Sequence, residues 1–355
     1  MWQERLSQLF KRRPDLRERV GSLILVDTPR LGVSGANVVF LTDRETKRFY
    51  AFKWVPSGQS NHSIAVQTRQ RKFLAGLYGE HHLPEVLAST SDAMLMEYAG
   101  ENLRSLIAAG RIPLDALERR VDRIYGKFAD VWLERRLPYT SGSLKHHRLA
   151  RDPQRRLKRI EQALRGITLH GLPLSAYWQS PLCINDGATC PSLAQVFKAL
   201  RKGYVPPHFM VPCHGDPTGD NLLVDPAKEG PWQLIDWEWA GWHDWRVVVS
   251  FMGEWWWSNS TTVAQATIEI KKGQAVINYH LEAPPATRVI TECAEALAGR
   301  IGKQFGEAEW RRQLALQRGL LLLGDLRFVE PRRLPVDHAV ALLGRGIEIL
   351  GSSLQ

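Results

Sequence analysis

The stretch Val211–Asn221, VPCHGDPTGDN, constrains this chain more than any other. It places one histidine, two aspartates and one asparagine within eight residues, next to Pro and Gly, and the apolar run LLV follows at once. Two interpretations are open for so polar a segment in front of a strand. Either the aspartates are turn residues that bond to their own backbone, or the carboxylates and the amide are arranged for chemistry.

The spacing H-x-D-x-x-x-x-N, from His214 to Asn221, is that of the catalytic loop of protein kinases, with Gly215 in place of the usual arginine. In that pattern Asp216 accepts a proton from a substrate hydroxyl and Asn221 binds Mg²⁺. A second carboxylate should follow a short hairpin, and Asp236 stands fifteen residues after Asn221. Magnesium prefers such hard oxygen ligands, and it neutralises the charge of a transferred phosphoryl group.

The same template predicts parts earlier in the chain. A lysine on the third strand should contact the α- and β-phosphates of ATP, and the sequence YAFKW supplies one. The turn LGVSGAN precedes that strand, where a loop over the phosphates is expected, and MEYAG would present backbone groups to adenine. The predicted nucleotide-contacting residues are Lys53, Gly32, Ser34, Gly35, Glu97 and Tyr98.

Short runs rich in β-branched and aromatic residues dominate the first hundred positions. Turn signals such as DRETK separate them, which predicts an antiparallel meander with one inserted helix. The N-terminal segment, residues 1–20, carries its apolar side chains on one helical face and predicts a helix, either packed on the core or lying on a membrane surface. We expect strands at residues 22–27, 37–43, 48–55, 85–90 and 93–99, and a helix at residues 63–78.

Helical patterns dominate after Gly100, interrupted by one short hairpin around NLLVD and WQLID. The sequence therefore predicts an α+β protein with a small β-rich lobe, residues 1–98, and a larger helical lobe, residues 99–355, that carries the catalytic loop and the acceptor site. We expect helices at residues 103–109, 115–135, 153–164 and 193–202, irregular structure at 172–192, and a helical pattern from 244 onward to about 351.

Composition narrows the class of protein. The chain has 355 residues, of which 44% are hydrophobic, and can bury a sizeable core. Four cysteines without a CxxC pair favour reduced thiols over disulfides or structural zinc. No apolar run is long enough to cross a bilayer and the N-terminus lacks a signal-peptide core, so we expect a cytoplasmic protein. The net charge of +10 favours anionic partners such as nucleotides, nucleic acid or anionic lipid.

The segment HGDPTGDNLLVD, followed by LIDWEWAGWHD, resembles the aminoglycoside phosphotransferase and choline kinase family. That family has the protein-kinase-like fold, and the resemblance is specific between His214 and Asp244. It implies a kinase that transfers the γ-phosphate of ATP to a hydroxyl of a small molecule. By this resemblance Asp216 is the base, Asn221 and Asp236 bind Mg²⁺, and Lys53 binds an ATP phosphate.

Two positions depart from the family's pattern. The family places a glutamate on the helix after the lysine strand, whereas this chain has Gln67 and Gln70 there, which could bond to Lys53 without forming an ion pair. Val248 stands where the family often has an aspartate that braces the catalytic loop. These changes leave open a nucleotide-binding pseudokinase with a regulatory role.

The acceptor would meet aromatic and acidic side chains downstream of the catalytic loop. Eight of the thirteen tryptophans fall between Trp232 and Trp257. Aromatic faces can pack on a sugar ring or hold an amine, and Glu238 and Glu254 would suit a cation, although packing in the core explains many of these residues equally well. The predicted acceptor residues are Glu238, Trp239, Asp244 and Trp255.

A third function class rests on the basic segment from Leu144 to Gly166. Such a segment is either a solvated helix face or a surface for nucleic acid or anionic membrane. The latter predicts binding that depends steeply on salt and does not need Asp216.

Overall fold

The computed structural model describes residues 2–16, 23–26, 30–31, 37–55, 64–98, 100–140, 153–185, 187, 189–329 and 334–354. The chain forms two compact units, residues 1–112 with 213–241 and residues 113–212 with 242–355. The catalytic loop and its hairpin thus pack with the first hundred residues, while the lobe boundary at residue 98 stays a prediction. No helix in the described ranges combines the length and apolarity needed to span a membrane.

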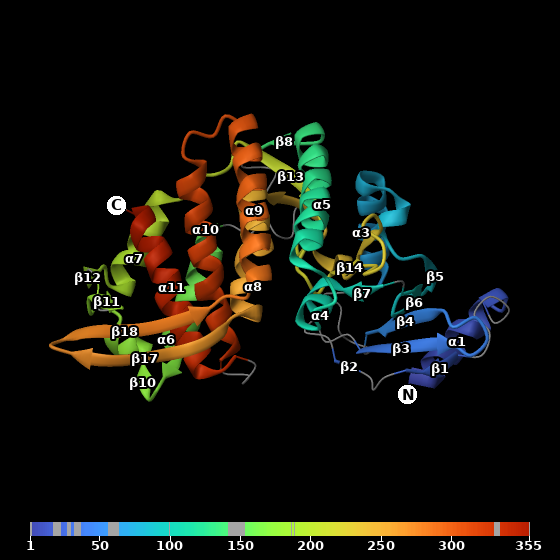
Figure 1. Cartoon of the computed structure of the whole chain (residues 1–355), viewed down its shortest axis with the longest axis horizontal. Helices are drawn as coiled ribbons and strands as arrows, with labels where there is room; N and C mark the ends of the chain where they lie inside the picture. Colours follow the sequence, from blue (N-terminus) through green and yellow to red (C-terminus); the bar gives the residue numbers. More distant parts are fainter. Residues whose placement is uncertain are drawn as a thin grey trace. The chain divides into compact units, whose positions relative to one another are not determined.

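The first unit is built on an antiparallel sheet in the order β1-β3-β4-β6-β5, with β2 paired to β3 (Figure 1). The tight turn after β3 sets the register, in which Val38 lies opposite Lys53 and Lys53 opposite Met94. The expected strands and their meander are confirmed. The strands are β1 (Leu23–Leu25), β2 (Arg30–Leu31), β3 (Asn37–Asp43), β4 (Phe49–Trp54), β5 (Val86–Ser89) and β6 (Ala93–Glu97).

Side chains of this sheet alternate between two faces, as strand geometry requires. One face carries Val39, Leu41 and Phe52, which are fully buried and form a core with Leu6 and Leu9 of α1 (Trp2–Arg12). Lys53 points to the opposite face, because it neighbours Phe52 along β4. The helix predicted for residues 1–20 ends at Arg12, since the residue before Pro14 disfavours the helical conformation.

A second, smaller sheet of the first unit carries the catalytic segment. It has the order β15-β14-β7, in which Leu222 pairs with Leu234 and Leu223 with Asn102. The predicted hairpin is therefore confirmed, and it lies beside the segment that follows β6. Its elements are β7 (Glu101–Asn102), β14 (Leu222–Val224) and β15 (Trp232–Leu234), accompanied by helices α3 (Ile64–Tyr78), η1 (Glu80–His82), α4 (Leu103–Ala108) and η4 (Trp237–Trp239).

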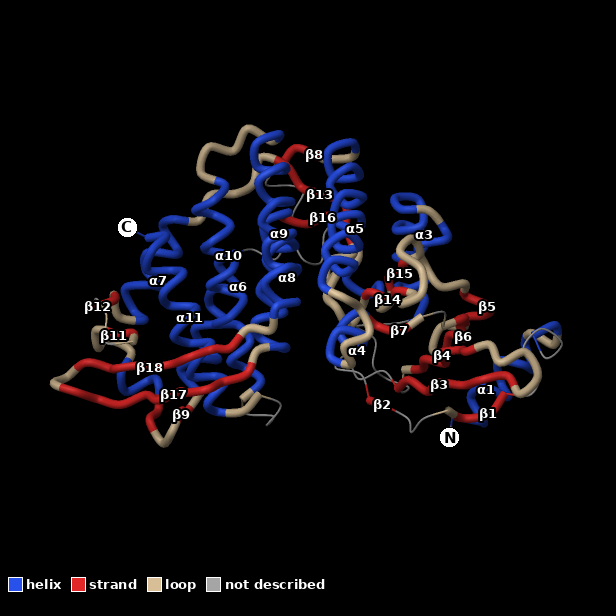
Figure 2. The backbone as a smooth tube through the Cα atoms, in the orientation of Figure 1, coloured by secondary structure: helices blue, strands red, loops and turns tan. Residues whose placement is uncertain are grey.

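The second unit is mainly helical (Figure 2). Helices α10 and α11 share one apolar core with α6 and α7, and α8 packs against α9 and α10. Helix α7 begins with a capping box, in which Ser192 and Gln195 bond reciprocally. The helices are α5 (Leu114–Glu134), α6 (Pro153–Gly166), η3 (Leu174–Tyr177), α7 (Leu193–Gly203), α8 (Trp245–Ser260), α9 (Pro285–Gln304), α10 (Trp310–Asp325), η5 (Leu326–Phe328) and α11 (Val336–Leu354).

The prediction of continuous helix after residue 244 is wrong. A long hairpin of β17 (Thr262–Lys271) and β18 (Gln274–Glu282) interrupts it and packs against α11. Lys272 and Gly273 at its tip both have positive φ, the conformation that a tight hairpin turn requires. The alternation of β-branched and polar residues in TVAQATIEIK was a strand signal that the helical pattern around it obscured.

Short strands also replace the irregular segment expected at residues 172–192. Strand β11 pairs in parallel with β18 and antiparallel with β12. The result is a four-stranded sheet in the order β12-β11-β18-β17. The short strands of this unit are β8 (Leu137–Pro138), β9 (Thr168–Leu169), β10 (Leu172–Pro173), β11 (Leu182–Ile184), β12 (Thr189–Cys190), β13 (Phe209–Cys213) and β16 (Gly241–Asp244).

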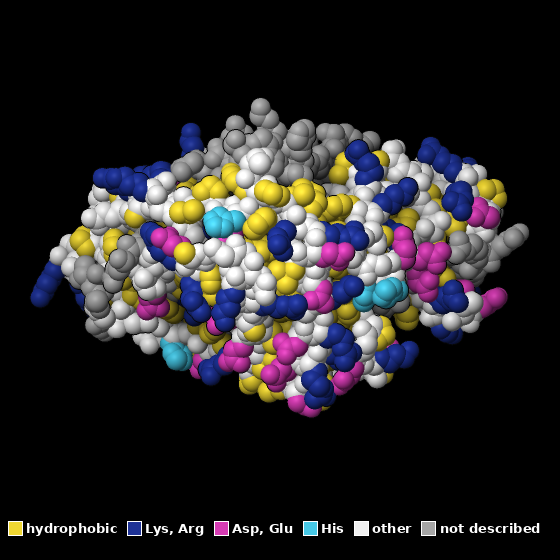
Figure 3. Space-filling model, turned by 90° about the horizontal axis from the view of Figure 1, so that it is seen from above, with side chains coloured by type: hydrophobic (Ala, Val, Ile, Leu, Met, Phe, Trp, Pro, Cys, Tyr) yellow, Lys and Arg dark blue, Asp and Glu magenta, His cyan; other side chains and the backbone are white. Residues whose placement is uncertain are grey.

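Charged side chains of both signs are mixed on the face shown in Figure 3. Among the residues coloured there, Lys and Arg are interspersed with Asp and Glu. In the described part of the basic segment, Glu161 forms ion pairs with Arg165 and Arg201, and Arg165 stacks on Trp178. Part of the positive charge of α6 is therefore compensated within the second unit.

Candidate active site

The β14–β15 hairpin brings the predicted metal ligands to one end of its ladder. Asn221 directly precedes β14, and its carbonyl oxygen accepts a hydrogen bond of 3.0 Å from the backbone N–H of Ile235. Asp236 is the next residue after Ile235. The hairpin thus places Asn221 and Asp236 next to each other, although fourteen residues separate them in the sequence.

His214 fixes the start of the catalytic loop to the same hairpin. Its Nε2 donates to the carbonyl of Ile235 at 2.7 Å, and the ring is almost fully buried. Burial lowers the pKa of His214, so the neutral imidazole is favoured and the ring acts as a brace. Gly215 has φ of +83°, which is costly for a residue with a Cβ and explains the glycine at this position.

Asp216 and Asn221 are in direct contact. The amide nitrogen of Asn221 donates to the Asp216 carboxylate at 3.0 Å and to its backbone carbonyl at 2.9 Å. These bonds orient the carboxylate. They also use the nitrogen of the amide, so the carbonyl oxygen of Asn221 is the atom suited to a cation.

Negative charge accumulates around Asp216. Burial, followed by the nearby carboxylate of Asp236, raises the pKa of Asp216 to about 7, and Glu238 and Asp220 add to the effect. The hydrogen bond from Asn221 acts in the opposite direction. A site that holds several carboxylates close together favours a bound cation, because the cation relieves their repulsion.

Lys53 is the positively charged side chain that contacts Asp236. Its Nζ lies 2.5 Å from a carboxylate oxygen of Asp236, and Lys53 is 7% exposed. Asp236 itself adopts a left-handed conformation with φ of +58°. The pairing joins the third strand of the sheet, as predicted for the lysine, to the predicted metal ligand.

Gln70 makes a contact that the sequence did not predict. The sequence allowed a bond from this residue to Lys53, but its Nε2 donates to the carbonyls of Glu238 at 2.7 Å and Ala240 at 3.3 Å. Gln67, one turn earlier on α3, is 1% exposed. Without an acid on this face of α3, Asp236 is the carboxylate that holds Lys53 in the structure.

The donor set fits a magnesium ion. Within the described residues no group of three or more His, Cys, Asp or Glu side chains is arranged to hold a metal. Magnesium in nucleotide sites, however, keeps several waters and takes one or two protein ligands besides the phosphates. One amide oxygen from Asn221 and one carboxylate from Asp236 meet that requirement.

The backbone N–H groups of the segment expected to contact adenine already form hydrogen bonds within the protein. The N–H of Glu97 donates to the carbonyl of Glu85, and that of Tyr98 donates to the carbonyl of Phe49. A base could use the carbonyl oxygens or the Tyr98 ring, which packs edge-on against Phe40 at 5.0 Å. The predicted phosphate loop with Gly32, Ser34 and Gly35 lies outside the described residues.

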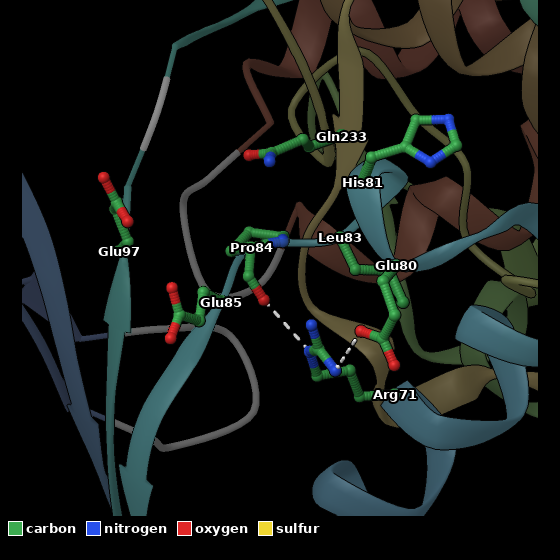
Figure 4. A pocket seen from close by; sticks show the side chains of 8 residues that line it. All are labelled: Arg71, Glu80, His81, Leu83, Pro84, Glu85, Glu97 and Gln233. Atoms are coloured by element: carbon green, nitrogen blue, oxygen red, sulfur yellow. Dashed lines mark hydrogen bonds and ion pairs between the residues drawn. The ribbon is translucent and has the colours of Figure 1, made fainter.

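A cavity of about 470 Å³ also lies in the first unit, lined by residues of α3, η1, β6 and β15 and by the segment before β5 (Figure 4). Arg71 lines it and bonds to Glu80 and to the carbonyl of Pro84. The Glu97 side chain, which also lines it, lies on the sheet face opposite Lys53, because it is three residues from Met94, the cross-strand neighbour of Lys53. The part of this cavity that Glu97 lines is therefore on the other face of the sheet from Lys53.

The predicted acceptor residues divide between the two units. Glu238 is buried and Trp239 half-buried in η4 of the first unit, whereas Asp244 and Trp255 belong to the second. Asp244 caps α8, and its carboxylate binds the buried guanidinium of Arg246 through two bonds of 2.8–2.9 Å.

Glu254 was expected to suit a cationic acceptor, and the structure contradicts this. Its side chain is fully buried and bonds to Arg318 at 2.5 Å and to Arg345 at 3.5 Å. The negative charge of Glu254 is thus already compensated by two arginines inside the protein. Four of the eight clustered tryptophans, Trp232, Trp237, Trp245 and Trp256, are buried in the core.

Solved structures of small-molecule kinases share this fold. A GDP complex of aminoglycoside 2'-phosphotransferase-IIIa superposes with a TM-score of 0.53 at 13% identity, covering 99% of this chain and 97% of that chain. A choline kinase from Cryptosporidium parvum Iowa II gives a TM-score of 0.54 at 11% identity, covering 98% and 95%. The α+β, protein-kinase-like fold is therefore confirmed. No curated protein matches the sequence.

A family model supplies the sequence-level assignment. The model of the phosphotransferase enzyme family (APH) matches residues 29–268, about two thirds of the chain, and includes both Lys53 and the segment from His214 to Asp244. The resemblance found in the catalytic loop thus extends over the sheet as well. The chain belongs to the phosphotransferase enzyme family.

Proposed function

We propose that this protein transfers the γ-phosphate of ATP to a hydroxyl group of a small molecule, with Asp216 as the base. The observation that carries the proposal is the grouping of two bonded pairs, Asp216 with Asn221 and Asp236 with Lys53, within one unit. The backbone bond between Ile235 and Asn221 brings the two pairs together. Chance turn residues would have no reason to converge with a buried lysine from another strand.

Each residue has a distinct role in the proposal. Asp216, oriented by Asn221, accepts the proton of the attacking hydroxyl and aims its oxygen at the phosphorus. Lys53 binds a phosphate oxygen. Mg²⁺, held by Asn221 and Asp236, supplies charge neutralisation on the phosphates when bound. The pKa of Asp216 near 7 in the metal-free protein falls when a cation arrives, so the carboxylate is ionised when substrate is bound.

The nucleotide would lie on the face of the sheet that carries Lys53. Glu97 would contact the base through its carbonyl oxygen, Tyr98 through its carbonyl oxygen or its ring, and Gly32, Ser34 and Gly35 would contact the phosphates. Glu238 and Trp239 of η4 are the proposed acceptor contacts of the first unit, and Asp244 and Trp255 of the second unit stay predictions from the sequence. The acceptor is a sugar-containing or amino-alcohol metabolite or antibiotic, and the protein acts in the cytoplasm.

The test is a nucleotide-consumption screen with ATP and with GTP, since a structural relative was solved with GDP. It covers sugars, amino alcohols, nucleosides, aminoglycosides and macrolides, each with and without Mg²⁺. We expect acceptor-dependent ADP or GDP release that requires Mg²⁺ and disappears in Asp216→Asn. Nucleotide binding without turnover on any acceptor would instead favour the regulatory pseudokinase.

A further inference from the structure

We infer that Gln70 is a positioning residue, which holds the metal-binding loop around Asp236 by donating to the carbonyls of Glu238 and Ala240. The inference rests on the proposed function, because it assigns a role at the proposed magnesium site. It concerns a contact between α3 and η4, both within the first unit.

The loop around Asp236 needs external support. Asp236 adopts φ of +58° and ψ of +59°, a conformation that is unfavourable for a non-glycine residue and persists only where the surroundings impose it. It is followed at once by η4, a single short turn that ends at Trp239. The last carbonyls of such a turn have no donor within the helix.

Side-chain donors hold this loop on both sides of Asp236. On the N-terminal side Trp237 Nε1 donates to the carbonyl of Leu234 at 2.7 Å, and His214 Nε2 donates to that of Ile235 at 2.7 Å. On the C-terminal side Gln70 donates to two carbonyls. Of these donors, Gln70 alone comes from α3, so it ties the loop to a helix that lies far from it in sequence.

The chemistry fixes which way the Gln70 amide faces. Both partners are carbonyl oxygens, which accept but cannot donate, so only the NH₂ group can satisfy them. Turning the amide over would place its oxygen against two others. In the described part of the molecule Gln70 Oε1 is buried and makes no hydrogen bond. The site therefore keeps an amide whose oxygen is unsatisfied, which indicates that the two donated bonds outweigh that cost.

The consequence is a link between metal binding and the nucleotide. Residues that orient a metal ligand from behind usually change metal affinity about 10- to 100-fold when removed. Gln70→Met keeps the length of the side chain and removes its donors. Mn²⁺, used in place of Mg²⁺, should strengthen the binding of a non-hydrolysable ATP analogue to the wild type. We expect this strengthening to be about tenfold smaller in the variant.

The measurement is the Kd of the analogue with Mn²⁺ and with EDTA, by calorimetry, and the ratio of the two values. In Gln70→Met we expect the ratio to fall about tenfold while the Kd in EDTA changes less than about threefold. Arg69→Met is the matched control, because it introduces the same side chain on an exposed position of the same helix. A merely structural role of Gln70 would lower thermal stability and leave the ratio unchanged.

A second variant covers the case in which Gln70→Met does not fold. Gln70→Asn keeps the amide but is one methylene shorter, so it cannot reach both carbonyls, and we expect a loss of about threefold in the same ratio. A wild-type ratio in both folded variants would overturn the role of Gln70 alone. Absence of any Mn²⁺ effect in the wild type would overturn the proposed function together with it.

Discussion

Two acidic clusters, one in each unit, differ in how their negative charge is compensated. In the first unit Asp236 and Glu238 lie near Asp216, and Lys53 forms an ion pair with Asp236. In the second unit Glu254 is fully buried, yet two guanidinium groups bind it, from Arg318 and Arg345. Both clusters contain acids beside tryptophans in sequence, so the sequence alone did not distinguish them.

The difference teaches how a ligand site is distinguished from a structural ion-pair network. A buried carboxylate whose charge is matched has nothing to offer a ligand, and its removal leaves its partners with an uncompensated charge. Carboxylates that repel one another, as those around Asp216 do, are stabilised by the arrival of a cation. Four experiments test this contrast, and their expected effects decrease in size from one to the next.

Removing the base should give the largest effect. Asp216→Asn cannot accept a proton, and we expect kcat to fall about 10³-fold with the acceptor found by screening, while nucleotide affinity is kept. Steady-state release of ADP measures the rate. Asp130→Asn, an exposed acid paired with Arg300, serves as the control and should keep its rate. A loss of less than tenfold in Asp216→Asn would contradict its role as the base.

Removing the matched acid of the second unit should destabilise the protein instead. Glu254→Gln leaves two guanidinium groups without their shared carboxylate, and we expect the free energy of unfolding to fall by about 3 kcal/mol. Urea denaturation gives the value. Glu295→Gln is the matched control, because Glu295 binds the same Arg318 but is 55% exposed, and it should cost less than about 1 kcal/mol. Equal losses in the two variants would remove the distinction between the clusters.

Stability of the metal-free protein should depend on pH through Asp216. Its pKa is raised to about 7 in the folded state, so the folded protein keeps a proton that the unfolded chain has released, and stability falls as pH rises from about 4 to 7. The shift corresponds to roughly 4 kcal/mol by linkage, and solvent that reaches the side chain reduces this to about 2 kcal/mol.

Asp216→Asn removes that ionisation and provides the check. In EDTA, urea midpoints at pH 5 and pH 8 should differ less in this variant than in the wild type, and the variant should be the more stable protein at pH 8. Added Mg²⁺ should raise the wild-type midpoint at pH 8. A variant that loses as much stability as the wild type between these pH values would assign the dependence to other groups.

The exposed edge of the first cluster should matter least. Arg104 lies 3.3 Å from Asp220, and both side chains are more than a third exposed. We expect Arg104→Met to change the free energy of unfolding by less than about 1 kcal/mol, because water screens the pair. Thermal denaturation in 0.05 M and 0.5 M NaCl measures it. A loss above about 2 kcal/mol would show that Asp220 belongs to the coupled acids of the site.

Much of the fold and of the candidate site could be predicted from short patterns. The alternation in NVVFLTD and YAFKW fixes strands and the face of Lys53, and the spacing from His214 to Asn221 fixes the catalytic loop, because both depend on neighbours in the chain. The hairpin that brings Asp236 beside Asn221 is equally local. Family membership follows from the same residues, since the family's pattern is defined by them.

Tertiary structure decided which partner each charged or amide group takes. Whether Lys53 bonds to α3 or to Asp236, whether Gln70 serves the lysine or the loop, and whether Glu254 faces a ligand or two arginines all depend on segments distant in sequence. The physical reason is that local patterns set backbone conformation and side-chain direction, whereas the energy of a buried charge is set by whatever packing places within a few ångströms of it.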